Sequence, residues 1–346
     1  MRRSRPEAPA AESTPKVSVV MSVQDGESYL RAAIQSVLDQ SFADFEFLIL
    51  DDASSDASRA IIASCDDPRI RLIENERNLG LTRSLNRGIR LSRGAYIARM
   101  DADDLSLPGR LQKQVDFLDA DPRCAVVASF AKRIDRHTAE VGVMTGPIEE
   151  ETIRKYLRRR NCLVHGSVMM RRQPLESVAL YDEAMRSSQD YDLWLRLSEE
   201  HRICCVPEFL YAWREHEDSI TGTRSDEQIS YAEIAQEKAR IRRVAGILSL
   251  LDRGSVEIRA SARLVAKLAR EEELRLLEAH AGRGFLSRLW RRLRRSSAYH
   301  RMLSRPRRLR EASRVLREYG AGGADSESAR SWLLAIIEGS PAARGM

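Results

Sequence analysis

The sequence predicts an α/β domain with a mainly parallel sheet, followed by an α-helical C-terminal region. Short apolar runs alternate with segments of helical apolar spacing over roughly the first hundred residues, which is typical of strand–helix–strand units. From about residue 228 onward only helical spacing remains. With 346 residues, 43% of them hydrophobic, the chain can bury one large core or two modest ones.

Local spacing predicts the first four strands and the helices between them. Runs rich in β-branched and aromatic residues indicate strands at 16–21, 45–50, 69–73 and 96–100. Helical spacing indicates helices at 29–38 and at 81–91, with Gly94 closing the latter. Ser54-Ser55-Asp56 is the predicted N-cap of another helix, which runs through Ile61 and Ile62. Ligands of such sheets bind beyond the carboxyl ends of the strands.

The pattern beyond residue 112 is less regular. We expect a helix at 114–118, a strand at 124–129 and a polar excursion from 132 to 151. Helical spacing returns at 228–252 and 255–280. The predicted domains are a disordered leader at 1–15, the α/β domain at 16–225 and a helical basic region at 226–346.

Composition argues against several classes of protein. No stretch approaches the roughly 18 consecutive apolar residues of a membrane span, and the basic N-terminus lacks the apolar core of a signal peptide. The five cysteines, an odd number without paired spacing, argue against a zinc site and against a complete disulfide framework. We therefore expect a protein of the reducing cytoplasm.

Three carboxylates follow the predicted strand at 96–100, namely Asp101, Asp103 and Asp104. Side chains at i and i+2 of an extended segment point the same way, which lets Asp101 and Asp103 converge beyond the strand end. Carboxylate oxygens suit Mg²⁺ or Mn²⁺, ions that commonly hold substrate phosphates. An acidic turn that caps the next helix is the alternative. Neither a glycine-rich dinucleotide motif nor a P-loop is present to bind phosphates instead.

Five motifs stand in a fixed order along the chain. They are Val17–Met21 with Gly26, Glu27, Tyr29 and Leu30; Ser36–Phe42; Leu50–Asp56; Asn78 to Gly88; and Met100–Leu111. Each is weak alone, but their order and spacing together resemble family 2 inverting glycosyltransferases of the GT-A fold. The resemblance runs from about residue 16 to residue 220, and Leu50–Asp56 looks like the family's Asp-Asp-Gly-Ser-Thr-Asp segment.

The resemblance implies a donor-binding set made of Ser22, Gln24, Asp25, Asp51, Asp52, Arg83, Asp101 and Ala102. Asp52 would accept a hydrogen bond from the imide N–H of uracil or thymine, and Asp51 would support that loop. Asp103, helped by Asp101, would bind a divalent ion, Mn²⁺ or Mg²⁺, that bridges the donor's diphosphate. His216 would approach this ion or the diphosphate. The ion would act as a Lewis acid on the leaving group.

The resemblance also implies an acceptor side. Asp190 falls where the family keeps its catalytic base, which removes the proton of the acceptor hydroxyl. Asp192 competes with it for this role. His165 stands in a His-x-Ser segment that resembles the acceptor side of the site. The alternative for Asp190 is the N-cap of a helix at 193–197.

Other candidates have structural alternatives as well. Asp51 and Asp52 fit a helix cap, His216 fits a structural or surface histidine, and Arg83 and Arg99 fit solvated or ion-paired arginines rather than phosphate ligands.

One pair of residues departs from the family pattern. Relatives often carry Tyr-Asn where this chain has Gln24-Asp25. Gln24 cannot stack on a base as an aromatic ring does, so the departure bears on the nucleotide affinity and on the choice of base.

The C-terminal region contains a basic segment. Residues 282–310 include eleven arginines and no acidic residue, with Leu286, Leu289, Trp290 and Leu293 at helical spacing. An amphipathic helix of this kind fits peripheral binding to an anionic membrane. The alternatives are a helix packed on the catalytic domain and contact with nucleic acid.

Together the motifs predict a metal-dependent glycosyltransferase. It would move a sugar from a UDP- or dTDP-sugar to a glycan or lipid-linked acceptor in bacterial surface polysaccharide or glycoconjugate synthesis, in the cytoplasm or peripherally on the inner membrane. A sugar nucleotidyltransferase is the enzymatic alternative, but residues 24–27 are not its basic, glycine-rich loop. A nucleic-acid-binding protein acting through residues 282–310 would leave the acidic strand ends unexplained, and no nucleic-acid partner is expected.

Overall fold

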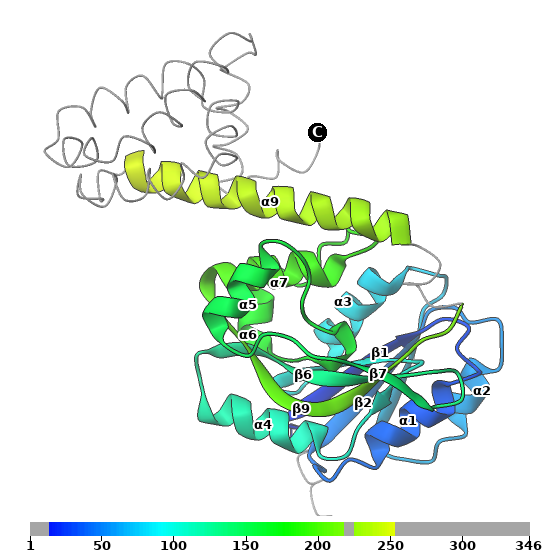
Figure 1. The fold of residues 1–346 in the computed structure, drawn as a ribbon. Coiled ribbons are helices and arrows are strands. Elements are labelled where there is room, and N and C mark those ends of the chain that lie inside the picture. The colour runs from blue at the N-terminus through cyan, green and yellow to red at the C-terminus, as the bar shows by residue number, and fades with distance from the viewer. Residues whose placement is uncertain (1–13, 218–224, 253–346) are drawn as a thin grey trace, which may run out of the picture. The chain divides into compact units, whose positions relative to one another are not determined.

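The computed structural model describes residues 14–217 and 225–252 of the chain. The chain divides into two compact units, Met1–Gln236 and Glu237–Met346, and the sheet belongs to the first (Figure 1). Most of the expected leader, the expected helix at 255–280 and the arginine-rich segment at 282–310 lie outside the described residues. The domain limits expected from the sequence stay a prediction.

Four parallel strands form one half of the sheet, which we call the parallel half. They are β1 (Val17–Val23), β2 (Phe45–Asp51), β3 (Ile70–Glu74) and β4 (Tyr96–Asp101), in the spatial order β3-β2-β1-β4. The helices between them are α1 (Leu30–Leu38), α2 (Ser58–Ala63) and α3 (Leu81–Leu91). These elements confirm the predicted strands and helices, apart from the start of α2.

The start of α2 corrects one prediction. Its N-cap is Ala57 rather than a residue of 54–56, and no side chain caps it from that position. The Asp56 carboxylate nevertheless accepts the backbone N–H of Ser58 at 2.9 Å. Asp56 therefore supports the first turn from the position before the observed N-cap.

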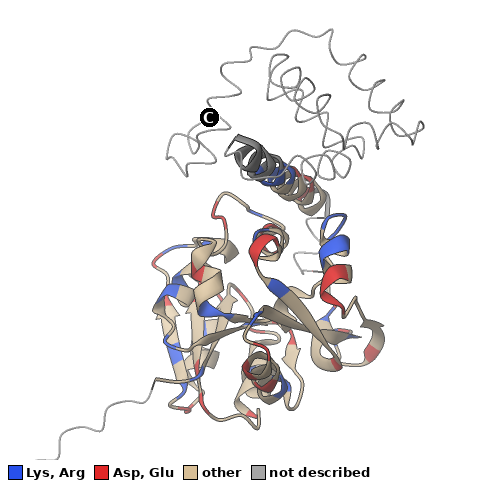
Figure 2. Cartoon of the chain, turned by 90° about the vertical axis from the view of Figure 1, so that its left-hand side faces the viewer, with Lys and Arg blue, Asp and Glu red and all other residues tan. Residues whose placement is uncertain are grey.

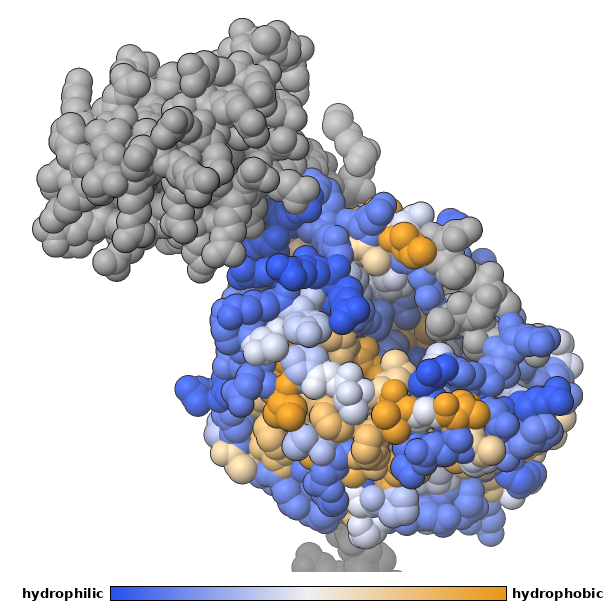
Figure 3. Space-filling view, in the orientation of Figure 1, coloured by the Kyte–Doolittle hydropathy of each residue, from blue (hydrophilic) through white to orange (hydrophobic). Residues whose placement is uncertain are grey.

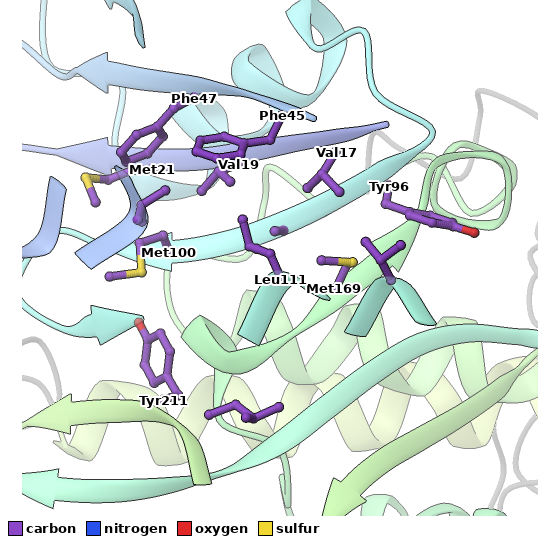
Figure 4. Packing of buried hydrophobic residues seen from close by; sticks show 14 of the residues in the cluster. Val17, Val19, Met21, Phe45, Phe47, Tyr96, Met100, Leu111, Met169 and Tyr211 are labelled. Carbon is purple, nitrogen blue, oxygen red and sulfur yellow. The ribbon is translucent and has the colours of Figure 1, made fainter. Parts of the chain in front are cut away.

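The central strands of the parallel half are buried on both faces, which explains their continuous apolar runs. Figure 4 shows residues of this core, among them Val17, Val19, Met21, Phe45, Phe47 and Leu111. On the opposite face α3 approaches closely at Gly88. A Cβ there would lie 2.6 Å from Leu50 Cδ1 and 2.7 Å from Val20 Cγ1, so only glycine lets α3 pack at this distance.

The other half of the sheet, the mixed half, combines both strand directions. It contains β5 (Leu105–Ser106), β6 (Cys124–Ile134), β7 (Glu140–Met144), β8 (Met169–Arg171) and β9 (Arg202–Arg214). β8 runs antiparallel to both β4 and β6 and so joins the two halves. β9 is parallel to β6, β5 pairs with β9, and β7 forms a hairpin with β6. Within the described residues the sheet has nine strands.

The helices of the mixed half are α4 (Arg110–Ala120), α5 (Glu150–Leu157), the 3₁₀ turn η1 (His165–Ser167), α6 (Arg172–Ser177) and α7 (Gln189–Glu200). Three expectations are corrected here. The helix expected at 114–118 begins at Arg110, and the polar excursion at 132–151 contains β7. α7 begins at Gln189 with Ser188 as N-cap, so Asp190 lies in the first turn and is not the cap.

α9 (Ser225–Asp252) confirms the helix predicted at 228–252. Its first three turns belong to the first unit and contact α7 there. Ser188 Oγ donates to the Gln228 carbonyl at 2.9 Å, and Gln236 Nε2 donates to the Tyr191 hydroxyl at 3.1 Å. In the part of the chain that the structure describes, no helix has the length and apolarity that a membrane crossing requires.

Charged residues occur throughout the helices and loops of the described chain, with both signs interspersed (Figure 2). Figure 3 shows hydrophobic side chains at the surface among hydrophilic ones. In the mixed half the large exposed hydrophobic side chains include Val141, Val143 and Phe209. Two of them lie in β7, which pairs only with β6 among the described strands and leaves its side chains less covered.

Candidate active site

Acidic residues of two strands meet at the carboxyl edge of the parallel half. In the strand register Ser22 of β1 lies beside Leu50 of β2 and Asp101 of β4, and Val23 lies beside Asp51. The ends of β2 and β4 are therefore separated by a single strand. The predicted donor-side residues at these ends share one rim, as the parallel-sheet rule requires.

Asp51 and Asp52 organise the loops beside this rim. The buried Asp52 accepts three hydrogen bonds, from Asn75 Nδ2 at 2.7 Å, the Leu79 backbone N–H at 2.8 Å and the Gly80 backbone N–H at 2.9 Å. Asp51 is buried as well and forms an ion pair with Arg59 at 2.8 Å. Both acids thus fix loops at the carboxyl edge of the parallel half.

The loop after β1 is tied to the loop after β2. Asp25 donates its backbone N–H to Ser54 Oγ at 3.1 Å and accepts the Ser55 backbone N–H at 2.7 Å. Gln24 beside it is exposed. Asp25 is therefore anchored to the loop after β2, whereas Gln24 is open to solvent.

The three acids Asp101, Asp103 and Asp104 have different surroundings. Asp101 ends β4 and forms an ion pair with Arg99 Nη2 at 2.5 Å. Asp103 is 35% exposed and contacts His216 Nε2 through Oδ2 at 2.9 Å. Asp104 is buried and accepts the backbone N–H of Arg214 at 2.7 Å. Only Asp101 and Asp103 therefore keep carboxylates at the rim.

β9 fastens this segment from the other side. The buried Arg214 donates Nε to the Asp103 carbonyl at 2.7 Å, and its guanidinium lies 4.6 Å from the ring centroid of Tyr29. Tyr29 in turn contacts the ring of His216 at 5.1 Å between centroids. Sequence reasoning assigned no role to Arg214, although it stands two residues before His216.

Tyr211 of β9 links Asp101 to the mixed half. Its hydroxyl accepts the Asp101 backbone N–H at 3.2 Å and lies against Gly166 of η1. A Cβ added at Gly166 would lie 1.9 Å from this hydroxyl oxygen and 2.8 Å from Asp101 Oδ2. Figure 4 shows the Tyr211 side chain and its hydroxyl oxygen among the buried residues. The fit requires glycine at position 166, and burial holds the pKa of Tyr211 well above its usual value.

Asp190 lies in the first turn of α7, close enough to Asp101 for the two carboxyl groups to interact electrostatically. Asn161 Nδ2 donates to Asp190 Oδ2 at 2.6 Å. Burial raises the pKa of Asp190, while hydrogen bonds from the Tyr191 backbone and Asn161 and the charge of Arg99 act in the opposite direction. The Arg99 guanidinium thus acts electrostatically on both Asp101 and Asp190. A carboxylate with a raised pKa, held close to a donor site, can accept a proton.

Asp192 differs from Asp190 in its surroundings. It is 1% exposed and forms an ion pair with Arg196 at 2.8 Å one helical turn later. Asp190 is only half-buried. The geometry therefore favours Asp190 over Asp192 as the acid that an acceptor can reach.

His165 and Arg83, two further predicted residues, are engaged within the protein. His165 Nε2 lies 2.7 Å from the Tyr181 hydroxyl, and burial together with the charge of Arg99 lowers its pKa well below the usual value. Arg83 is exposed and forms a long ion pair with Glu183 at 3.6 Å. His165 is thus a neutral imidazole at the site, whereas Arg83 matches its ion-paired alternative.

The residues at the rim fit a divalent cation that shares its ligands with a diphosphate. No group of three or more His, Cys, Asp or Glu side chains among the described residues forms a ready cage. Mg²⁺, however, usually takes one or two carboxylates and completes its shell with substrate phosphates and water. His216 offers a further ligand, because its Nδ1 is buried with no hydrogen-bond partner in the described structure.

Sequence reasoning missed the residues that hold the site together. Asn161, Tyr211 and Arg214 contact Asp190, Asp101 and Asp103, respectively. Arg214 could have been found from the sequence, because it stands two residues before His216, a predicted site residue. Asn161 had no such signal, since a single asparagine in a loop is common.

Comparisons with known proteins identify a family. The family model described as Glycosyl transferase family 2 matches residues 18–179. An uncharacterized glycosyltransferase of Methanocaldococcus jannaschii is 36% identical over 210 residues, covering 58% of this chain and 71% of its own. The succinoglycan biosynthesis protein ExoO of Rhizobium meliloti is 32% identical over 251 residues, covering 68% and 71%.

A solved structure confirms the fold. The crystal structure of S. aureus TarS in complex with UDP-GlcNAc superposes with a TM-score of 0.54 at 16% identity, covering 76% of this chain and 75% of that one. This likeness supports the predicted GT-A architecture. The order of the motifs, the acid-lined rim and the match to a relative over most of its length lead to one conclusion: the chain belongs to glycosyl transferase family 2.

Proposed function

We propose that the protein is an inverting glycosyltransferase that moves a sugar from a UDP- or dTDP-sugar to a hydroxyl group of a glycan or lipid-linked acceptor. One observation carries the proposal. A single buried arginine, Arg99, pairs with Asp101 at 2.5 Å and acts on the charge of Asp190, so the donor rim and a candidate base belong to one electrostatic cluster.

The donor would bind at the rim of the parallel half. Asp52 and the segment that it holds at Asn75, Leu79 and Gly80 would receive the base. Asp103, with Asp101 and His216, would hold a divalent ion against the diphosphate. That ion supplies neutralisation of the negative charge that develops on the leaving group. The TarS complex, which contains UDP-GlcNAc, supports a nucleotide sugar as the donor class.

Asp190 would act as the general base. It accepts the proton of the acceptor hydroxyl while the hydroxyl oxygen forms a bond to the anomeric carbon. The bond between that carbon and the phosphate oxygen breaks, and its electron pair leaves with the nucleoside diphosphate. Attack opposite the leaving group inverts the anomeric centre, and the base must be ionised at that moment.

Relatives support a place in polysaccharide synthesis. ExoO is named as a succinoglycan biosynthesis protein and is 32% identical to this chain over 251 residues. A growing polysaccharide or its lipid-linked precursor offers sugar hydroxyls of the kind that Asp190 would deprotonate. The relatives support this acceptor class, and the arrangement of the site supports the proposed chemistry.

The proposal is tested with a panel of UDP- and dTDP-sugars, with and without Mn²⁺. We expect at least one sugar nucleotide to raise the melting temperature in a Mn²⁺-dependent way, because a ligand of the native state stabilises it. We also expect slow release of UDP or dTDP from that donor, with water as the acceptor. Absence of any Mn²⁺-dependent shift and of any hydrolysis across the panel would contradict the proposed function.

A further inference from the structure

We propose that Asn161 is a positioning residue for the general base, because its side chain fixes the orientation of the Asp190 carboxylate. The inference rests on the proposed function of Asp190 as that base. Asn161 Nδ2 donates to Asp190 Oδ2 at 2.6 Å. Backbone N–H groups of the first turn of α7 also donate to this carboxyl group, so Asn161 supplies the side-chain contact that fixes it from outside the helix.

The orientation of the Asn161 amide is fixed by a second contact. Its Oδ1 accepts the Leu163 backbone N–H at 3.2 Å. An amide turned the other way would place Oδ1 against the Asp190 carboxylate and Nδ2 against a backbone donor, which loses both hydrogen bonds. Asn161 therefore presents a donor, and only a donor, to Asp190.

The loop that carries Asn161 is held on both sides. On the N-terminal side, the Tyr191 hydroxyl donates to the Leu157 carbonyl at 2.6 Å, and Gln236 Nε2 donates to the Arg159 carbonyl at 2.8 Å. On the C-terminal side, the loop continues into η1, where Gly166 and Ser167 are buried. Asp190 and Tyr191 are successive residues of α7, and they contact this loop at two positions four residues apart, Asn161 and Leu157.

The charged and titratable groups that act on Asp190 come from β4 and from the segment before α7. Arg99 and Asp101 belong to β4, and Tyr181 precedes α7. Burial raises the pKa of Asp190, and the hydrogen bond from Asn161 acts to lower it. Asn161 thus stabilises the ionised carboxylate in addition to orienting it, because its N–H donates more strongly to the charged carboxylate than to the protonated carboxyl group.

The test compares Asn161→Ala and Asn161→Asp with the wild type in hydrolysis of the UDP-sugar that the wild type turns over. We expect kcat to fall roughly tenfold to a hundredfold in Asn161→Ala, the loss expected for a hydrogen bond to a charged group, with the KM of the donor unchanged. Asn161→Asp keeps the shape of the side chain but replaces the donor by a carboxylate, and its loss is larger. In both variants the acid limb of the kcat profile moves to higher pH.

Asn75→Ala is the matched control. Asn75 also donates to a carboxylate, Asp52, at 2.7 Å, but on the donor side of the site. We expect this variant to raise the KM of the donor and to leave the acid limb in place. A fall in kcat without movement of the acid limb in the Asn161 variants, or an unchanged kcat, would overturn the positioning role.

A second measurement does not depend on turnover. Carbon-13 NMR of labelled aspartate carboxyl groups, with Asp190 assigned from its loss in Asp190→Asn, follows the titration of Asp190 directly. A higher pKa of Asp190 in Asn161→Ala supports the inference, and an unchanged titration overturns it. Failure of the wild type to use any donor refutes the proposed function alone, since the titration still decides what Asn161 does.

Discussion

The parallel and mixed halves of the sheet hold their acids in different ways. In the parallel half, Asp52 is fixed mainly by backbone donors of the loop next to it, at Leu79 and Gly80. In the mixed half, Asp190 is fixed by a side chain, Asn161, from a loop that precedes it by 29 positions in the chain. The first arrangement would preform the surface that we propose for the donor's base. The second would tune the proposed general base, and a change of one side chain would alter it.

The largest expected effect tests the base of the mixed half. Asp190→Asn should lower the rate of donor hydrolysis by about a hundredfold to ten-thousandfold while donor affinity stays the same, because the amide cannot accept the proton. Rates of UDP release and calorimetry with UDP and Mn²⁺ measure the two quantities. Asp192→Asn is the control, and we expect it to cost stability but to keep the rate. Full activity of Asp190→Asn would assign the base to another residue.

The next effect tests the rim of the parallel half. Asp103→Asn should weaken Mn²⁺-dependent UDP binding by roughly a hundredfold, because the amide removes the charge that would hold the cation. Calorimetric titration with UDP in the presence and absence of Mn²⁺ measures the change. Binding without Mn²⁺ should be nearly equal in variant and wild type. Equal affinity with Mn²⁺ would show that the cation is held elsewhere.

A smaller effect tests the contact that joins the halves. Gly166→Ala should lower the free energy of unfolding by about 1–3 kcal/mol, because its Cβ would overlap the Tyr211 hydroxyl and approach Asp101. Urea denaturation measures the change. Gly142→Ala is the control, since the nearest atom to its Cβ is Arg133 Nη1 at 3.4 Å, at the end of a flexible side chain. Equal stability of both variants would contradict the prediction, because it would mean that η1 moves to accommodate the added Cβ without a loss of stability.

The smallest effect concerns an internal acid of the parallel half. Burial acts to raise the pKa of Glu46, but hydrogen bonds from Ser18, the Arg93 backbone and Arg71 hold it below the usual value of 4.5. The native state therefore binds fewer protons than the unfolded chain near that pH. The stability that Glu46 contributes is complete above pH 4.5 and is lost as the pH falls through the lowered pKa.

Glu46→Gln should accordingly lower the free energy of unfolding by about 1–2 kcal/mol at neutral pH, since the partly exposed arginines are screened by solvent. The difference from the wild type should shrink in acid. Urea denaturation at several pH values measures it. Glu151→Gln, which removes an exposed pair with Lys155, serves as the control and should change little. A difference that grows in acid would contradict the sign of the pKa shift.

Sequence reasoning succeeded where structure depends on neighbouring residues. The four strands and the helices of the parallel half follow from apolar spacing, because each βαβ unit closes within a few tens of residues. It failed at β7 and β9. β7 is short and contains Gly142, and β9 contains Pro207 and register shifts against β6, so neither shows a regular alternation.

The candidate site divides in the same manner. The sequence identifies four acids because they lie at the ends of predicted strands or just beyond them, namely Asp51, Asp52, Asp101 and Asp103. Asn161, Tyr211 and Gly166 could not, since their partners lie 29 to 110 positions away. No local pattern records which distant loop will contact a given carboxylate.

The sequence by itself determined the fold class, the order of the family 2 motifs and the acids at the strand ends, because all three are properties of short segments. The tertiary structure decided which of those acids stay accessible. It turned Asp104 and Asp192 inward, paired Asp101 with Arg99 and gave Asp190 the Asn161 donor. The physical reason is that burial and hydrogen bonding set the charge state of a carboxyl group, and both depend on what the folded chain brings beside it.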